Sequence, residues 1–137
     1  MSRRAAREHA FIIVYQLSFH DDFETQQALD CYLTEMSISP GPKDLEFISQ
    51  EIEGIRANIP EIDQKIEEFA SGWALNRLSK VDLAIMRLAA YELLYQPSIP
   101  AKVSINEAVE LAKRYGADSS PGFVNGVLGQ VYRSFCE

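Results

Sequence analysis

The chain of 137 residues is 47% hydrophobic and 24% charged, which is enough apolar content for one compact domain with a real core. Its net charge of −7 argues against a broadly basic nucleic-acid-binding protein, and its two cysteines, Cys31 and Cys136, form no zinc or redox motif. The opening residues lead straight into an amphipathic pattern without a cleavage site. We therefore expect no signal peptide, and a cytoplasmic protein with reduced thiols.

The charge is distributed unevenly along the chain. Residues 1–20 carry a net charge of +2, residues 21–68 a net charge of −10, and residues 69–137 a net charge of +1. Because the acidity is confined to the middle segment, the two ends could still bind a polyanion. Such binding is expected to be modest and sensitive to salt unless a more basic partner contributes.

The first predicted helix spans the opening residues and carries two different strips. Its core stripe consists of apolar residues at helical spacing: Ala6, Ala10, Ile13, Val14 and Leu17. Arg4, Phe11 and Tyr15 line up well off that stripe. Aromatic side chains interleaved with arginine can form a stacking surface for unpaired bases. Residue types alone favour the alternative, in which the second helix buries Phe11 and Tyr15 and the arginines are simply solvated.

Three more helices are predicted before residue 74. The second opens at Asp21–Asp22, the third begins at Pro42 after a break, and the fourth begins at Pro60. Their inward-facing residues are expected to be Leu29, Tyr32, Leu33 and Met36; then Leu45, Ile48, Ile52 and Ile55; then Ile62, Ile66, Phe69 and Trp73.

Residues 79–95 predict the helix around which the others pack, because they are apolar on nearly every side. Ser79 is expected to cap this helix, with Asp82 three residues on. Three interior charges and two following prolines favour the centre of a soluble bundle over a membrane span.

Two final helices complete the prediction. Ser104 and Glu107 predict a capping box at the start of the first of these helices. Gly116 is expected to end the same helix in a left-handed conformation. Residues 119–121 begin the last helix, whose expected core residues are Val124, Val127, Leu128, Val131 and Phe135. Gly126 and Gly129 would allow another helix to approach closely. No stretch alternates with the period of a strand, so the predicted fold class is all-α.

The sequence contains few candidates for catalytic or metal-binding residues. His9 and His20 lack the acid three residues earlier that di-iron bundles use, and no glycine-rich loop follows a strand. Asp82, Glu92 and Glu107 could form an acid/base set, but capping and buried pairing with Arg87 explain them more simply. Asn106 and Asn125 are expected to hydrogen-bond between helices. We therefore predict no enzyme, no catalytic residue, no metal and no cofactor.

Four segments carry a resemblance to a known family: RRAAREHAFIIVYQL, WALNRLSKVDLAIMRLAAYEL, PAKVSINEAVELAKRYG and SSPGFVNGVLGQV. Together they resemble the NusB family of bacterial transcription antitermination factors over essentially the whole chain. The resemblance implies one NusB-like all-α domain of about seven helices, arranged as two perpendicular three-helix bundles. The N-terminal sub-bundle would cover about residues 1–57 and the C-terminal one about residues 58–137.

The same resemblance implies a non-enzymatic role in transcription. A protein of this family binds the boxA element of nascent ribosomal RNA together with NusE, a ribosomal protein. The complex then joins the elongating RNA polymerase and other Nus factors and suppresses premature termination. Some members self-associate, so the resemblance leaves a monomer and a homodimer open.

The resemblance also assigns residues. The RNA-facing positions would be Arg3, Arg4, Arg7, Tyr15, Ser119 and Phe123, and the neighbourhood of Asp82 would contact NusE. Ala5 and Ala6 interrupt a basic run that is often more continuous in the family, so weak RNA binding is expected without a partner.

Two alternatives from other classes stay open. The chain could be a detached RNA-binding domain of a ribosomal RNA cytosine methyltransferase, because a similar domain also occurs fused to a catalytic one. It could instead be a purely protein-binding helical adaptor that works through the loop at residues 97–103 and the last two helices.

Overall fold

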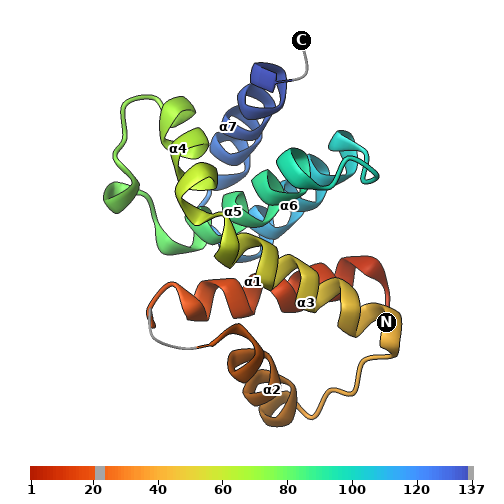
Figure 1. The fold of residues 1–137 in the computed structure, drawn as a ribbon. Helices are drawn as coiled ribbons and strands as arrows, with labels where there is room; N and C mark the ends of the chain where they lie inside the picture. Colours follow the sequence, from red (N-terminus) through yellow and green to blue (C-terminus); the bar gives the residue numbers. More distant parts are fainter. Residues whose placement is uncertain (21–23, 136–137) are drawn as a thin grey trace.

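A computed structural model describes residues 1–20 and 24–135 of the chain (Figure 1). Within these residues it has seven α-helices, one 3-10 turn and no strand, which confirms the all-α prediction. The elements are α1 (Arg3–Leu17), α2 (Thr25–Met36), α3 (Pro42–Ala57), α4 (Ile59–Phe69), η1 (Leu75–Arg77), α5 (Lys80–Tyr95), α6 (Ala101–Tyr115) and α7 (Ser120–Phe135). In this part of the chain, none of the helices is long and apolar enough to cross a bilayer.

Helix α5 lies at the centre of the molecule, as predicted. It packs against α1, α3, α4, α6 and α7, and from Leu83 to Leu93 every residue except Arg87 is buried. The Ser79 hydroxyl accepts a hydrogen bond from the Asp82 N–H at 3.0 Å, so the predicted cap is confirmed. Burying a Leu or Ile side chain stabilises a fold by about 1.5–3 kcal/mol, and the buried residues of this helix therefore contribute substantially to the stability of the core.

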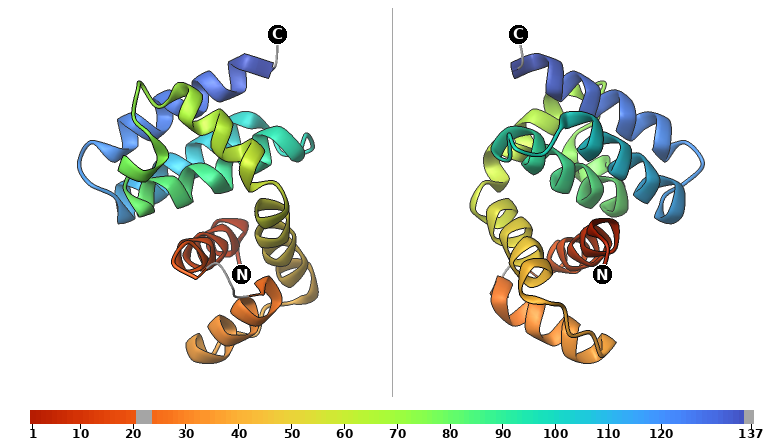
Figure 2. Two further views of the ribbon diagram at one scale, coloured as in Figure 1. Left: turned by 60° about the vertical axis from the view of Figure 1, so that its left-hand side comes forward. Right: turned by 90° about the vertical axis from the view of Figure 1, so that its right-hand side faces the viewer.

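Helix α1 packs against α2, α3 and α5. In both views of Figure 2 it lies between α2 on one side and α5, α6 and α7 on the other. Ala6, Ala10, Ile13 and Val14 are buried and Leu17 is half-buried, which confirms the predicted core stripe. Helix α3 ends at Ala57 and α4 begins two residues later; a division into sub-bundles near residue 58 stays a prediction.

Two predicted signals at the ends of α6 are wrong. Helix α6 starts at Ala101, directly after Pro100, so Ser104 lies inside the helix and cannot cap it. Gly116 is extended, with φ −93° and ψ −175°, and is not a left-handed stop. Its role is close approach, because a Cβ there would lie 2.6 Å from the Ser120 side chain and 2.9 Å from the carbonyl oxygen of Ala112.

Several residues expected in the interior are exposed. Helix α4 ends at Phe69, and Ser71 and Gly72 then adopt positive φ values of 56° and 85°, which turn the chain so that Trp73 faces solvent. Other side chains that were expected inside but are exposed are Met36, Leu45 and Phe135. The expected interhelix partners Asn106 and Asn125 are exposed too, and a Cβ on Gly126 would meet nothing within 4 Å. Asp21, Asp22 and Cys136 lie outside the described residues.

Candidate nucleic-acid interface

The three N-terminal arginines belong to the first turns of α1, and each points to a different helix. Ser2 caps the helix by accepting a hydrogen bond from the Ala5 N–H at 3.0 Å. The Arg3 guanidinium lies 4.2 Å from the centre of the Phe47 ring on α3, a cation–π distance. The other two arginines pair with acids on α6 and α5. The basic segment is therefore an anchored helix and not a free arm.

Arg7 is buried, with an exposed fraction of 6%, and forms an ion pair with Glu92 of α5. Its Nε and Nη2 donate to the two carboxylate oxygens at 3.0 and 3.2 Å, and the Ser104 hydroxyl donates to the same carboxylate at 2.6 Å. Its burial argues against the predicted assignment of Arg7 to the RNA surface, because its charge neutralises a carboxylate inside the core. Removing either partner would leave an uncompensated buried charge.

A second carboxyl group, that of Glu51 on α3, is buried beside this pair. Burial raises the pKa of Glu51, and the hydrogen bond to Glu92 and its negative charge raise that pKa further. Glu51 is therefore protonated in the folded protein at neutral pH. The cluster of Arg7, Glu51 and Glu92 then holds one positive and one negative charge, which is the arrangement that a buried site tolerates.

Arg4 remains accessible although it is paired. Its Nη2 lies 2.8 Å from Oε2 of Glu107 on α6 and its Nε lies 3.1 Å from Oε1. The Arg4 side chain is 69% exposed, and its hydrogen bond and charge lower the pKa of Glu107. A phosphate group could therefore reach this guanidinium from solvent, in competition with Glu107.

Four aromatic rings lie in a row next to Arg4, here called the aromatic row. They are Tyr115 of α6, Phe11 and Tyr15 of α1, and Phe19 just after α1. Their consecutive ring centres are 5.1, 6.4 and 5.1 Å apart. Phe11 is buried, as the alternative interpretation expected, and its ring contacts Tyr115 of α6. Tyr15 is half-buried, and the two end members, Phe19 and Tyr115, are exposed at 53% and 37%. The buried part of the aromatic row is therefore Phe11, between Tyr115 and Tyr15.

At the Tyr115 end of the aromatic row, Glu8 joins α1 to α6. Its Oε2 accepts a hydrogen bond from the Tyr115 hydroxyl at 2.6 Å and pairs with Arg114 at 2.9 Å. Burial, followed by the hydrogen bond to Glu8, raises the pKa of Tyr115 to about 12. The C-terminal end of α6 is thus fastened to α1, and Arg114 stays as exposed as Arg4.

This part of the surface also includes four residues that were not predicted from the sequence: Phe19, Lys80, Arg114 and Tyr115. A signal existed for Phe19, because it lies four residues after Tyr15 and extends the same helical strip. None existed for Lys80, whose Nζ lies 5.7 Å from the centre of the Phe19 ring, because the two residues are far apart in sequence.

The remaining predicted residues lie at the starts of α7 and α5. Ser119 is exposed, and its carbonyl accepts a hydrogen bond from the Phe123 N–H at 3.2 Å. Phe123 is half-buried at the edge of the core. Asp82 lies half-buried in the first turn of α5, and its Oδ1 is covered and has no hydrogen-bond partner among the described residues. Roles in RNA or partner binding stay predictions for all three.

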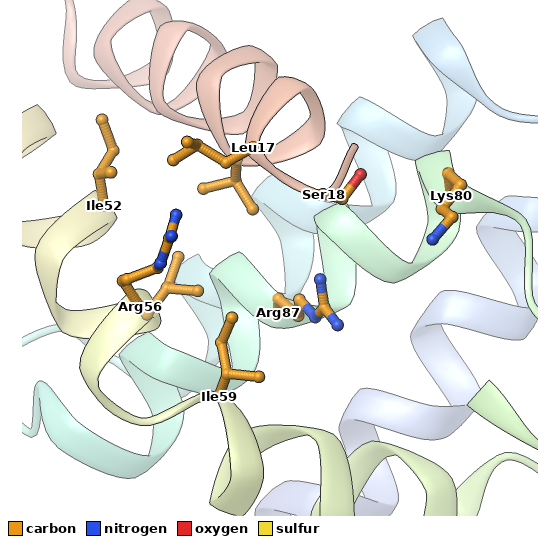
Figure 3. Close-up of a pocket in the computed structure, with 9 residues that line it drawn as sticks. Leu17, Ser18, Ile52, Arg56, Ile59, Lys80 and Arg87 are labelled. Carbon is orange, nitrogen blue, oxygen red and sulfur yellow. The ribbon is translucent and has the colours of Figure 1, made fainter. Parts of the chain in front are cut away.

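A cavity of about 360 Å³ opens near the Phe19 end of the aromatic row, between α1, α3 and α5 (Figure 3). Its lining residues are Val14, Leu17, Ser18, Ile52, Ile55, Arg56, Ile59, Lys80 and Arg87. Arg87 pairs with Asp63 of α4 through two contacts of 2.8 Å, and not with the acids considered from the sequence. Within residues 1–20 and 24–135, no His, Cys, Asp and Glu side chains gather in a group that could hold a metal ion.

Comparison with known proteins gives consistent matches over the whole fold. A family model described as the NusB family matches residues 4–133. Transcription antitermination protein NusB of Agathobacter rectalis is 44% identical over 130 residues, covering 95% of this chain and 98% of that protein. The Clostridium novyi protein of the same name is 42% identical over 134 residues, covering 98% and 100%.

Solved structures agree. T. maritima NusB superposes with a TM-score of 0.90 at 39% identity, covering 100% of this chain and 94% of that one. A crystal structure of the antitermination factors NusB and NusE in complex with dsRNA contains a chain that matches with a TM-score of 0.87 at 26% identity, covering 97% of each chain.

Proposed function

This chain belongs to the NusB family, and we propose on that basis that it is a transcription antitermination factor that binds RNA together with a NusE protein. The observation that carries the proposal is the match over 97% of both chains with a NusB protein solved with NusE and RNA. The proposed binding partners are taken from that relative, and the proposed surface is taken from the family resemblance and supported by the exposure of side chains in this chain.

We propose that the RNA surface consists of Arg3, Arg4, Tyr15, Ser119 and Phe123. Arg4 supports this assignment because its guanidinium is accessible from solvent although it is paired. Tyr15 supports it because its half-buried ring is held in place by neighbours on both sides, which lowers the entropy lost when a base stacks on it. Arg7 is left out, since it is buried.

The charge of the molecule explains why a partner is part of the proposal. The chain has a net charge of −7, and both arginines of the proposed surface also make contacts within the protein. Two phosphate contacts with a single strand give a salt slope of only about −1.4. A more basic NusE protein that binds near Asp82 would supply the remaining positive charge and share a boxA-type RNA of the nascent ribosomal transcript. The complex would act on the elongating polymerase in the cytoplasm by binding, without catalysis.

The first test measures binding of a boxA-type RNA at fixed moderate salt, with and without the organism's own NusE. We expect tight, sequence-dependent binding only when NusE is present. Arg4→Glu and Tyr15→Asp should weaken it, whereas Arg133→Glu, a charge reversal on the exposed last turn of α7, should not.

Two results would contradict the proposal. Loss of RNA binding in every condition, with NusE binding retained, would leave a helical adaptor. Unchanged RNA binding by both Arg4→Glu and Tyr15→Asp, with the wild-type protein binding well, would show that the RNA occupies a different surface.

A further inference from the structure

The two ends of the aromatic row, Tyr115 and Phe19, are both exposed. At the Tyr115 end the protein uses the side chain itself, because the Tyr115 ring packs on Phe11 and its hydroxyl donates a hydrogen bond to Glu8. Phe11 has an exposed fraction of 2%, so no base can stack on it. Phe19 has an exposed fraction of 53%, which is high for a side chain whose burial would stabilise the fold.

Phe19 is exposed but held in a defined position. It follows the last turn of α1, and its N–H donates a hydrogen bond to the Gln16 carbonyl at 3.2 Å. The Tyr15 ring meets the Phe19 ring nearly edge to face, at 5.1 Å and an interplanar angle of 78°. Contacts of this kind between aromatic rings fix their orientation. An exposed ring with a fixed orientation loses little entropy when another ring stacks on it.

A positive charge accompanies this ring. The Lys80 Nζ, at the start of α5, lies 5.7 Å from the Phe19 ring centre. An aromatic platform beside a lysine matches the two parts of a nucleotide, because the ring accepts the base and the ammonium group accepts the phosphate. Trp73, another exposed aromatic side chain, lies beside Arg77 on the α4–α5 connection and is not part of the aromatic row.

We propose that Phe19 and Lys80 form an additional nucleotide-binding position that extends the RNA surface beyond Tyr15. Phe19 stacks on an unpaired base, and Lys80 pairs with the phosphate next to that base. The 5.1 Å between the Tyr15 and Phe19 rings allows neighbouring nucleotides of one strand to contact both. This inference rests on the proposed function, and it specifies single-stranded RNA, since paired bases in a duplex do not expose their faces.

A purely structural role for Phe19 makes different predictions. Ser18 and Lys80 both line the cavity of Figure 3, so the Phe19 ring could serve only to shield that apolar space from water. Removing the ring would then lower the stability of the protein and leave the RNA affinity of the folded molecules unchanged. Affinity and stability must therefore be measured on the same variants.

The experiment uses the full chain with its NusE partner and a single-stranded boxA-type RNA of about 12 nucleotides, within the usual site sizes of 4–16. Phe19→Ala should weaken binding by about 5- to 150-fold, the range for loss of one base–aromatic stack. Phe19→Trp should restore the affinity. Lys80→Ala should reduce the salt slope by about 0.7. Trp73→Ala is the matched control, because it removes another exposed aromatic side chain and should change nothing.

A second readout does not depend on affinity. The chain has one tryptophan, so Phe19→Trp in a Trp73→Phe background places the only fluorescent indole at the proposed position. Its emission should be quenched when the single-stranded RNA binds, and much less when the same RNA is annealed to its complement.

The possible results separate the two proposals. If Tyr15→Ala weakens RNA binding while Phe19→Ala binds like Trp73→Ala, the additional position does not exist but the proposed function stands. A loss of stability in Phe19→Ala with unchanged affinity also overturns the inference. If the wild-type complex binds neither form of RNA, the proposed function fails and the additional position fails with it.

Discussion

The buried pair of Arg7 and Glu92 gives the sharpest test of how the N-terminal arginines divide their roles. Their side chains are 7% and 1% exposed, and two hydrogen bonds of 3.0 and 3.2 Å join them. Arg7→Met keeps the apolar length of the side chain but leaves the Glu92 carboxylate without its counter-charge. Breaking a buried pair in this way costs about 3–5 kcal/mol.

That loss would be large for this protein. Domains of this size have unfolding free energies of about 5–15 kcal/mol. With an unfolding entropy of about 2.1 cal/mol/K for each residue, the same loss lowers the Tm by about 10–17 °C. Urea unfolding followed by circular dichroism should show it as a lower midpoint with an unchanged slope.

Arg4→Met is the matched control, since the Arg4 pair is open to solvent. It should change the unfolding midpoint little and weaken RNA binding. Arg7→Met should lower the unfolding midpoint and leave RNA binding unchanged at a temperature where the variant is folded. An Arg7→Met variant with wild-type stability and weakened RNA binding would refute the division of roles derived from the structure.

Three further substitutions test other parts of the fold. Burial raises the pKa of Glu51 in the folded protein above its ordinary value of 4.5, so the free energy of unfolding should fall as the pH rises above 4.5. The slope is at most ~1.4 kcal/mol per pH unit. Glu51→Gln should flatten it in urea titrations at pH 5, 7 and 9. Gly116→Ala should destabilise the protein by about 1–3 kcal/mol through the clash with Ser120, and a neutral effect in thermal unfolding would contradict it. Gly126→Ala, in open space within α7, should stabilise by about 0.5–1 kcal/mol; a lower Tm would show an unseen contact.

Periodicity predicted most of the fold. The stripe of small and β-branched residues in α1 and the all-round apolar character of α5 are local properties, and both were read correctly. The end of α4 was misread because the helical pattern was continued to Trp73 across Ser71–Gly72, where both residues adopt positive φ. A Ser-Gly dipeptide is a turn signal, so this boundary could have been predicted from the sequence.

The candidate site was predicted less well, for a physical reason. Arg3, Arg4 and Arg7 look equivalent in sequence, and their partners lie on three different helices. One clue was present: Glu92 sits in a helix with no polar face, so it had to be buried and needed a cation. Arg87 could not provide it, because residues five apart on a helix do not face each other. Arg7, three residues before Ala10 on the core stripe, was the available partner.

The contacts of α1 also set an order of events during synthesis. Arg7 and Arg4 bond to residues 85 and 103 positions later, and Glu8 to one 107 positions later. Domains assemble as the ribosome releases them, so α1 emerges first and must keep its apolar stripe and its arginines unmatched until α5 and α6 have been made. The closure entropy of such distant contacts slows this step. The proposed RNA surface, which includes Arg4 and Tyr15, is therefore fixed in place only when the chain is almost complete.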